Sequence, residues 1–479
     1  MKMLKNFFII ALSMFCFACN VGEKYKQPNF YDDNKIAAEL HLKPTNHLPN
    51  NWYLQLKDEQ LNQLIQQGLC SSTSVMVALS RLKQARQNLL INITSFLPQI
   101  NAQGGYNYNK SSKKISASVN SNYYTAGFDA SWEIDLWGKS LRQYETDEAK
   151  VNAANLSLIN AHNLLAADIA LNYVKLQQNI RNLELLQKNL FLQKEIFSTV
   201  KYKYDNGLTD EISYRQAEYL LADTQAQIPQ YESNIEAYRN SLATLVGILP
   251  SAVQISSTSL FKGNYIHNSS KIYDLPANVI RQRPDVQIAE QNLIAQNAQV
   301  AKAIANLYPD VNISGFWGYA AKNGSGLFNS ESQTYNYAPS ISMPILDWNR
   351  LQNNVLLQKY IKEENLAQYK QALLNAVSEL KNSMMAYENS LKSQKKQFVA
   401  TANIEKATYL SRSKFENGLI EFSDLLTMQQ NLIKAQRDSV NATADVWQNL
   451  IAYYKASGAT IDSCILQTES CQKVSEAYK

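Results

Sequence analysis

Two hydrophobic patterns alternate along the chain, and the same succession occurs twice. Residues 73–95 and 284–306 carry apolar residues at helical spacing, and after a proline in each copy the pattern changes to alternation with period two. The apolar side of the alternating stretches consists of Ile100, Ala102, Gly104, Tyr106, Tyr108, Tyr124, Ala126, Phe128, Ala130, Trp132 and Ile134 in the first copy, and of Val311, Ile313, Trp317, Tyr319, Tyr335, Tyr337, Ile341, Met343 and Ile345 in the second. These patterns predict β-hairpins over residues 97–136 and 308–347.

A long helical pattern follows each hairpin, over residues 138–205 and 349–416. Neither stretch contains Pro or, beyond its first residue, Gly, and 68 helical residues would span about 100 Å. In the first copy apolar residues recur every seven positions, as in a coiled coil. Asn-Gly pairs then predict turns, and return helices over 209–247 and 420–458 follow. In each copy the short first helix and the return helix, stacked end to end, would match the long helix, as the wall of a tube requires.

The two copies align without a gap at an offset of 211 residues, residues 72–247 against 283–458. The aligned pairs include Pro98 with Pro309, Trp137 with Trp348, and both Asn-Gly-Leu turns, which makes chance alignment very improbable. The chain therefore contains a duplicated structural unit. The remaining segments are a leader and tether over 1–50, a helix over 51–71, a bridge over 248–282 and a tail over 459–479.

The N-terminus has the pattern of an export signal. Two lysines precede an apolar run over residues 7–18, which is too short to span a bilayer as a helix. Ala18 before Cys19 predicts cleavage of signal peptide 1–18 and lipidation of Cys19, and Asn20 favours sorting to the outer membrane of a Gram-negative cell. The alternative is ordinary cleavage that leaves a free or paired Cys19 thiol. No later apolar stretch reaches about 18 residues, so a membrane crossing would require strands.

The predicted strands have the length that crosses a bilayer when tilted, about 11 residues each. Their polar side would then face a lumen, whereas the alternative is a soluble hairpin with one buried face. Four strands per chain cannot close a barrel or leave their edges unpaired in lipid. The pattern therefore predicts oligomerisation, and three copies would supply twelve strands.

Charge and composition exclude several functional classes. The chain has a net charge of +5, or +3 without the leader, which is not typical of nucleic-acid binding. Its four histidines are scattered, and no metal-ligand spacing, glycine loop or nucleophile elbow occurs. We therefore expect no enzyme activity, no cofactor and no metal site. The spacing of Cys464 and Cys471 favours a disulfide over metal binding by the pair, and Cys70 is interpreted as a buried thiol.

Four sequence motifs together resemble one family. They are Cys19 with the following Tyr25-Lys26-Gln27-Pro28, the helix with Trp52 and Leu61, the run Arg283-Pro284-Asp285-Val286, and the turns 203–207 and 414–418. The chain resembles the TolC-type outer-membrane factors, specifically the NodT-like lipoprotein branch that serves resistance-nodulation-division efflux systems. The resemblance implies a mostly α fold with a membrane β-barrel, internally duplicated, whose trimer forms a 12-strand outer-membrane barrel and a long periplasmic α-helical barrel. Residues 51–71 and 248–282 would then be equatorial.

The resemblance also implies the functional residues and partners. Asp424 corresponds to an acidic residue at the periplasmic gate, while Thr427 and Ile420 depart from the family pattern there. The implied partners are two further copies of the chain, a periplasmic membrane-fusion adaptor, an inner-membrane resistance-nodulation-division transporter and outer-membrane lipid. The residues implied to dock the adaptor are Lys203, Tyr204, Asn206, Gly207, Lys414, Phe415, Asn417 and Gly418.

These observations predict a passive exit duct of a tripartite efflux pump, which exports small toxic compounds across the periplasm and outer membrane. Two alternatives remain open from the sequence. One is a duct of the same fold that serves type I protein secretion, and the other is a coiled-coil lipoprotein scaffold without a pore.

Overall fold

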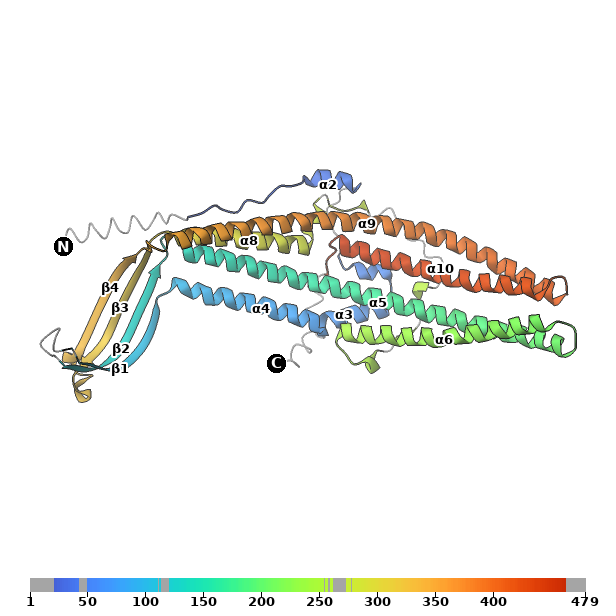
Figure 1. Cartoon of the computed structure of the whole chain (residues 1–479), viewed down its shortest axis with the longest axis horizontal. Coiled ribbons are helices and arrows are strands. Elements are labelled where there is room, and N and C mark those ends of the chain that lie inside the picture. The colour runs from blue at the N-terminus through green and yellow to red at the C-terminus, as the bar shows by residue number, and fades with distance from the viewer. Residues whose placement is uncertain are drawn as a thin grey trace. The chain divides into compact units, whose positions relative to one another are not determined.

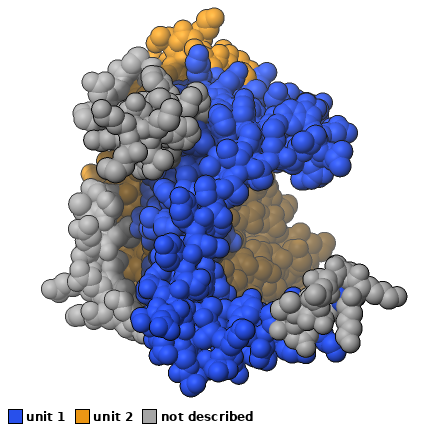
Figure 2. Space-filling model, turned by 90° about the vertical axis from the view of Figure 1, so that its left-hand side faces the viewer, with its two compact units in different colours: residues 1–28, 81–155, 288–370 blue, residues 29–80, 156–287, 371–479 orange. Residues whose placement is uncertain are grey.

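The computed structural model describes residues 21–42, 50–110, 112, 120–253, 255–256, 259–261, 273–276 and 278–461. The chain divides into two compact units, coloured separately in Figure 2. Unit 1 comprises residues 1–28, 81–155 and 288–370, and unit 2 comprises residues 29–80, 156–287 and 371–479. Each unit therefore takes segments from both copies of the repeat.

Unit 1 contains a four-stranded antiparallel sheet (Figure 1). Its strands, in spatial order, are β1 (Gln99–Lys110), β2 (Asn120–Ile134), β3 (Asp310–Ala321) and β4 (Gln333–Ser342). β1 pairs with β2 and β3 pairs with β4, as the two predicted hairpins require. The pairing of β2 with β3 joins the copies, so the duplicated hairpins form one sheet with β1 and β4 at its edges.

The strand register collects the apolar positions on one face of this sheet. Phe128 lies opposite Ala102 on one side and opposite Trp317 on the other, and Trp317 lies opposite Tyr335. Residues directly opposite each other point to the same face, so the alternation predicted for each strand becomes a continuous apolar surface. That surface is solvent-exposed in the single chain: Tyr335 is 77% exposed and Ile341 is 74% exposed.

The apolar alternation predicted for the last strand extends too far. β4 ends at Ser342, so Met343 and Ile345 lie beyond the sheet. Pro344 follows Met343, and a proline lacks the N–H that a strand needs for its ladder hydrogen bonds. The prediction that these two residues continue the strand is therefore wrong.

Six long helices make up most of the described chain (Figure 1). The first copy contributes α4 (Thr73–Ile93), α5 (Lys139–Asp205) and α6 (Glu211–Val246), and the second contributes α8 (Pro284–Ala305), α9 (Trp348–Glu416) and α10 (Phe422–Ala456). The prediction of a mostly α, internally duplicated chain is confirmed. None of the described helices has both the length and the hydropathy needed to cross a membrane.

Within unit 2 the return helix of each copy ends against the start of that copy's first helix. Gly247 follows α6 with φ +84°, and a Cβ there would lie 2.5 Å from the Ser71 carbonyl oxygen, just before α4 begins. In the second copy Gly458 occupies the same place against Arg283, the residue before α8. The two junctions are 211 residues apart, as the alignment of the copies requires.

Arg283 closes the second junction with a buried guanidinium, which is 7% exposed. It donates to Asp285 Oδ1 and Oδ2 over 3.0 and 2.7 Å, to Glu379 Oε2 over 2.7 Å and to the Ala456 carbonyl over 2.9 Å. Burial alone would lower the pKa of Arg283, but the hydrogen bonds and charges of the two carboxylates raise it overall. The family-like run at 283–286 thus joins the start of α8 to α9 and to the end of α10.

Unit 2 also contains three shorter α-helices, α2 (Asp33–Glu39), α3 (Glu59–Ser71) and α7 (Val279–Gln282). Trp52 is 1% exposed and stacks on Tyr454 with ring centroids 5.4 Å apart. Cys70, near the end of α3, is half-buried and disulfide-bonded. The interpretation of Cys70 as a buried thiol is therefore wrong. The other four cysteines of the chain, Cys16, Cys19, Cys464 and Cys471, lie outside the described residues, and so does the partner of Cys70.

Candidate functional site at the helical tips

The turn between α5 and α6 is a tight left-handed cap. Gly207 has φ +67°, which L side chains adopt only with strain. The Gly207 amide donates to the Tyr204 carbonyl over 2.9 Å, and the Leu208 amide donates to the Lys203 carbonyl over 2.7 Å. The Asn206 side chain donates to the Tyr202 carbonyl over 2.7 Å, so it is used inside the turn.

The turn between α9 and α10 repeats this geometry at the same offset. Gly418 has φ +73°, and its amide donates to the Phe415 carbonyl over 3.0 Å. Leu419 donates to the Lys414 carbonyl over 2.9 Å, and the Asn417 side chain donates to the Ser413 carbonyl over 2.7 Å. The structure therefore gives the same conformation to both predicted tips.

A shared hydrophobic cluster packs the two hairpins together. Its buried members are Ile196, Val200, Ala217, Phe415, Phe422 and Leu425, which come from both copies of the repeat. Phe415 is only 9% exposed and packs against Phe422 with ring centroids 5.7 Å apart. The expectation that Phe415 itself contacts an adaptor conflicts with this burial, because the ring lies inside the cluster rather than on its surface.

A cation–π contact connects the two tips, and an aromatic pair packs within the first. The Lys203 ammonium lies 4.5 Å from the centre of the Phe415 ring, a cation–π contact across the copies. Tyr204 stacks on Tyr214 with ring centroids 5.0 Å apart, and Lys414 is exposed. Leu208 and Leu419 are 70% and 72% exposed, so each turn also presents an apolar side chain to its surroundings.

The two return helices begin with different caps. Asp210 caps α6 by accepting a 3.0 Å hydrogen bond from the Ser213 amide, and the hydrogen bonds from Ser213 lower the pKa of Asp210. The equivalent residue of the second copy, Glu421, makes no such bond to the start of α10. A capping side chain normally satisfies one of the free amides in a first turn. The first turn of α10 is instead held by burial of Phe422 and Leu425 in the tip cluster.

Asp424 lies in this first turn of α10 and is exposed. Leu425, the next residue, is fully buried in the tip cluster, which fixes the helix face and directs Asp424 away from the cluster. The Thr427 hydroxyl donates a hydrogen bond to the Ser423 carbonyl of its own helix, and Ile420 packs against the cluster. The two departures from the family pattern thus have local structural roles.

One feature of this region was not found from the sequence. A cavity of about 410 Å³ lies among α5, α9 and α10, lined in part by Leu192, Gln193, Tyr409 and Gln429. Gln193 is 5% exposed, and among the described residues neither of its amide atoms has a hydrogen-bond partner. Helical periodicity could have placed Gln193 on the packed face of α5, but not beside a cavity. No cluster of metal-ligating side chains occurs among the residues that the structure describes.

The family model described as outer membrane efflux protein matches residues 64–248 and 275–459, more than three quarters of the chain. This chain belongs to the outer membrane efflux protein family. The family model matches twice, once on each copy of the repeat, and each match contains the strands, the long helix and one tip.

Full-length relatives agree with this assignment. Nodulation protein T of Rhizobium leguminosarum bv. trifolii is 26% identical over 448 residues, which cover 93% of this chain and 94% of the relative. Cation efflux system protein CusC of Escherichia coli O6:H1 is 23% identical over 461 residues, which cover 94% of this chain and 97% of the relative. The solved outer-membrane channel OprN matches with a TM-score of 0.84 at 26% identity, over 92% of this chain and 99% of that chain.

The chain is thus an outer-membrane efflux channel, the exit duct of a tripartite efflux system. The relatives are channel proteins rather than enzymes. The tips and the sheet are the two parts of the chain from which a more detailed function can be argued.

Proposed function

We propose that three copies of the efflux channel assemble through the free edges of the sheet. Two features of the sheet support this. Its apolar face is exposed, and its edge strands are β1 and β4. An unpaired edge in lipid leaves backbone groups without partners, at several kcal/mol each. Joining β4 of one copy to β1 of the next closes twelve strands into one continuous sheet, with the apolar face toward lipid and the polar face toward the duct.

Two adjacent residues of β4 test this orientation. Tyr337 is 78% exposed on the apolar face, and Ala338 lies on the opposite face, where it pairs with Ser314. An arginine facing lipid near mid-bilayer costs about 2–4 kcal/mol, whereas one facing the duct is solvated. Tyr337→Arg should therefore reduce the amount of protein in the outer-membrane fraction, and Ala338→Arg should not. Equal amounts of the two variants would refute the proposed orientation.

The tips are the docking surface for a periplasmic adaptor in this account. The exposed Leu208 and Leu419 supply apolar contacts, Lys414 supplies charge, and Phe415 supports the surface from beneath. Capture of the adaptor by the purified channel should weaken in Leu208→Asp and Leu419→Asp, and it should persist in Leu249→Asp. Leu249 is similarly exposed, at 76%, but lies beyond the end of α6. Equal loss in all three variants would argue against docking at the tips.

Asp424 acts as the gate in the same account. In a threefold assembly three exposed carboxylates at the start of α10 would approach the axis, and a ring of acids favours cations. Asp424→Asn should therefore reduce cation selectivity, measured as the reversal potential in a salt gradient. Asp223→Asn is the control, because Asp223 is an exposed acid on α6 that accepts a hydrogen bond from Gln227. An unchanged reversal potential in Asp424→Asn would remove the gate role and leave the duct intact.

Lipidation of Cys19 anchors the channel in this proposal. The sequence around Cys19 supports it, although the residue lies outside the described part of the chain. Metabolic labelling with radioactive palmitate should mark the wild-type chain and leave Cys19→Ser unlabelled. A wild-type chain without label would reject lipidation.

The cargo in this proposal is small toxic compounds. CusC is named as a cation efflux protein, so a toxic metal cation and a toxic organic compound are the two probes to compare. Deletion of the channel should lower the tolerated concentration of at least one of them, and the cloned gene should restore it. Unchanged tolerance to both, together with loss of a secreted protein, would favour the secretion duct.

A further inference from the structure

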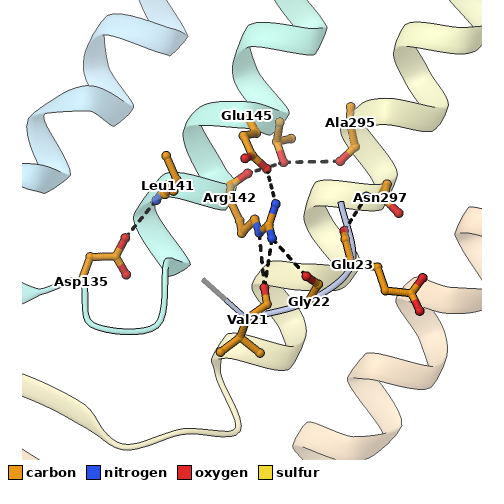
Figure 3. Close-up of polar contacts among 10 residues, drawn as sticks. Val21, Gly22, Glu23, Asp135, Leu141, Arg142, Glu145, Ala295 and Asn297 are labelled. Carbon is orange, nitrogen blue, oxygen red and sulfur yellow. Dashed lines mark hydrogen bonds and ion pairs between the residues drawn. The ribbon is translucent and has the colours of Figure 1, made fainter. Parts of the chain in front are cut away.

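Within unit 1, a buried arginine binds a short segment that follows the predicted lipidation site. We call residues 21–28 the strap. Arg142, in the first turn of α5, is 2% exposed and donates to the Val21 carbonyl from Nε and Nη2, each over 3.3 Å, and to the Gly22 carbonyl over 3.2 Å (Figure 3). Glu145 balances its charge over 2.7 Å. A buried guanidinium is thus used to hold backbone carbonyls of a segment 120 residues away.

Further contacts continue along the strap. The side chain of Asn297, itself 6% exposed, donates to the Glu23 carbonyl over 3.1 Å (Figure 3). The Tyr25 hydroxyl donates to Glu290 Oε1 over 3.2 Å. Gly22 crosses α8 closely with φ +95°, and a Cβ at that position would lie 2.5 Å from the Ala301 Cβ. Successive residues of the strap are therefore fixed to α5 and α8 mainly through their backbone.

The internal duplication provides a comparison within the same molecule. At the 211-residue offset Arg142 corresponds to Asn353, which is exposed and bonds only Asn349 of its own helix among the described contacts. Ala301 corresponds to Leu90, whose larger side chain is 54% exposed. The position related to the strap site by the duplication, which Asn353 and Leu90 would line, thus lacks the features that hold the strap. This asymmetry indicates that Arg142 and Ala301 serve the strap and not the repeat fold.

The strap begins at the end of the sheet. The Val21 amide donates to the Trp137 carbonyl over 3.3 Å, just after β2. Trp137 stacks on Tyr308 with ring centroids 4.8 Å apart, and its indole donates to the Pro309 carbonyl over 2.8 Å, just before β3. Trp and Tyr are enriched where a membrane protein meets the membrane–water interface. Covalent geometry limits Cys19 to about 7 Å from Val21.

We propose that Arg142 is a positioning residue that holds the strap so that the lipid anchor enters the membrane beside Trp137 and Tyr308. The anchor and the sheet are then fixed at the same level, and the chain after Cys19 cannot swing away from the channel. This role rests on the proposed lipidation of Cys19, whereas the binding of the strap does not.

Limited trypsin digestion of outer-membrane fragments, whose periplasmic face is open to the protease, tests the inference. Lys24 and Lys26 are exposed, so the attachment of the strap backbone is what should protect them. In Arg142→Met, cleavage after Lys24 should be at least about tenfold faster than in wild type, because several buried charge-assisted hydrogen bonds are lost. Arg142→Lys should give intermediate protection. Arg350→Met, which removes an exposed arginine from the start of α9, should leave the rate unchanged.

Two further readouts separate the alternatives. Cleavage after Lys414 at the tip is the internal reference, because a general loss of stability would raise both rates. Gly22→Ala alters the strap without changing α5, so it carries the test if Arg142→Met fails to reach the membrane. Cleavage after Lys24 within about twofold of wild type in both variants would overturn the inference. If the strap of the wild-type chain resists trypsin but the chain carries no palmitate label, the lipid-positioning role is rejected and the binding of the strap stands.

Discussion

Loss of the Arg283 guanidinium should destabilise the channel more than loss of a surface arginine. The perturbation is Arg283→Met, which keeps an unbranched side chain and removes every donor. The Ala456 carbonyl would then lose a buried hydrogen bond, at about 1–3 kcal/mol. The carboxylates of Asp285 and Glu379 are 45% and 61% exposed and can be solvated again, which limits their share of the cost. Together these contributions give about 2–4 kcal/mol.

The assay is a urea titration of the purified protein in detergent, followed by far-ultraviolet circular dichroism. The matched control is Arg350→Met, because Arg350 and its partner Asp347 are 68% and 58% exposed, and an exposed pair contributes less than about 1 kcal/mol. The midpoint for Arg283→Met should lie clearly below that of the control. Unfolding free energies of the two variants that agree to within about 0.5 kcal/mol would refute the reasoning that the buried hydrogen bonds of Arg283 stabilise the fold.

Three further predictions concern the tips and the interior of unit 2. Gly418→Ala should destabilise the second tip by about 1–2 kcal/mol, measured by the rate of proteolysis there, because φ is +73°; Gly324→Ala, in equally open space without positive φ, should have no effect. Lys203→Met should lower the urea midpoint by an amount equivalent to about 0.5–1 kcal/mol through loss of its cation–π contact, and Lys414→Met should lower it less. Burial lowers the pKa of His162, so only the unfolded state gains a proton just below pH ~6.5. Stability should therefore fall as the pH falls through that range in wild type, and less steeply in His162→Gln; parallel melting curves for the two proteins would contradict this.

The fold was largely predictable because the duplication repeats each signal. Two hairpins, two long helices and two Asn-Gly turns each occur at one offset, and local chemistry sets each of them: alternation sets the strands, absence of Gly and Pro sets the helices, and glycine allows the turns. The pairing of β2 with β3 does not follow from either copy alone. It depends on the arrangement of the copies in space, which no local pattern encodes.

The site was predictable in position and less so in detail. The tip turns have the expected sequence and geometry, but Phe415 is buried by contacts with Phe422 from the following helix and with the other hairpin. The role of Arg142 gave no signal in the sequence, because the strap carbonyls that it binds lie about 120 residues away. Gln193 was missed for a similar reason, since periodicity reports which face of a helix is packed and not whether that packing is complete.

The central claim is that this chain forms a channel, and single-channel recording in planar lipid bilayers tests it most directly. The purified full-length protein should produce discrete conductance steps of small amplitude, and the ring of Asp424 carboxylates that we propose should make them cation-selective. A preparation with native helical content that inserts into the bilayer and conducts no current under any voltage or salt condition would contradict the account and favour the scaffold without a pore.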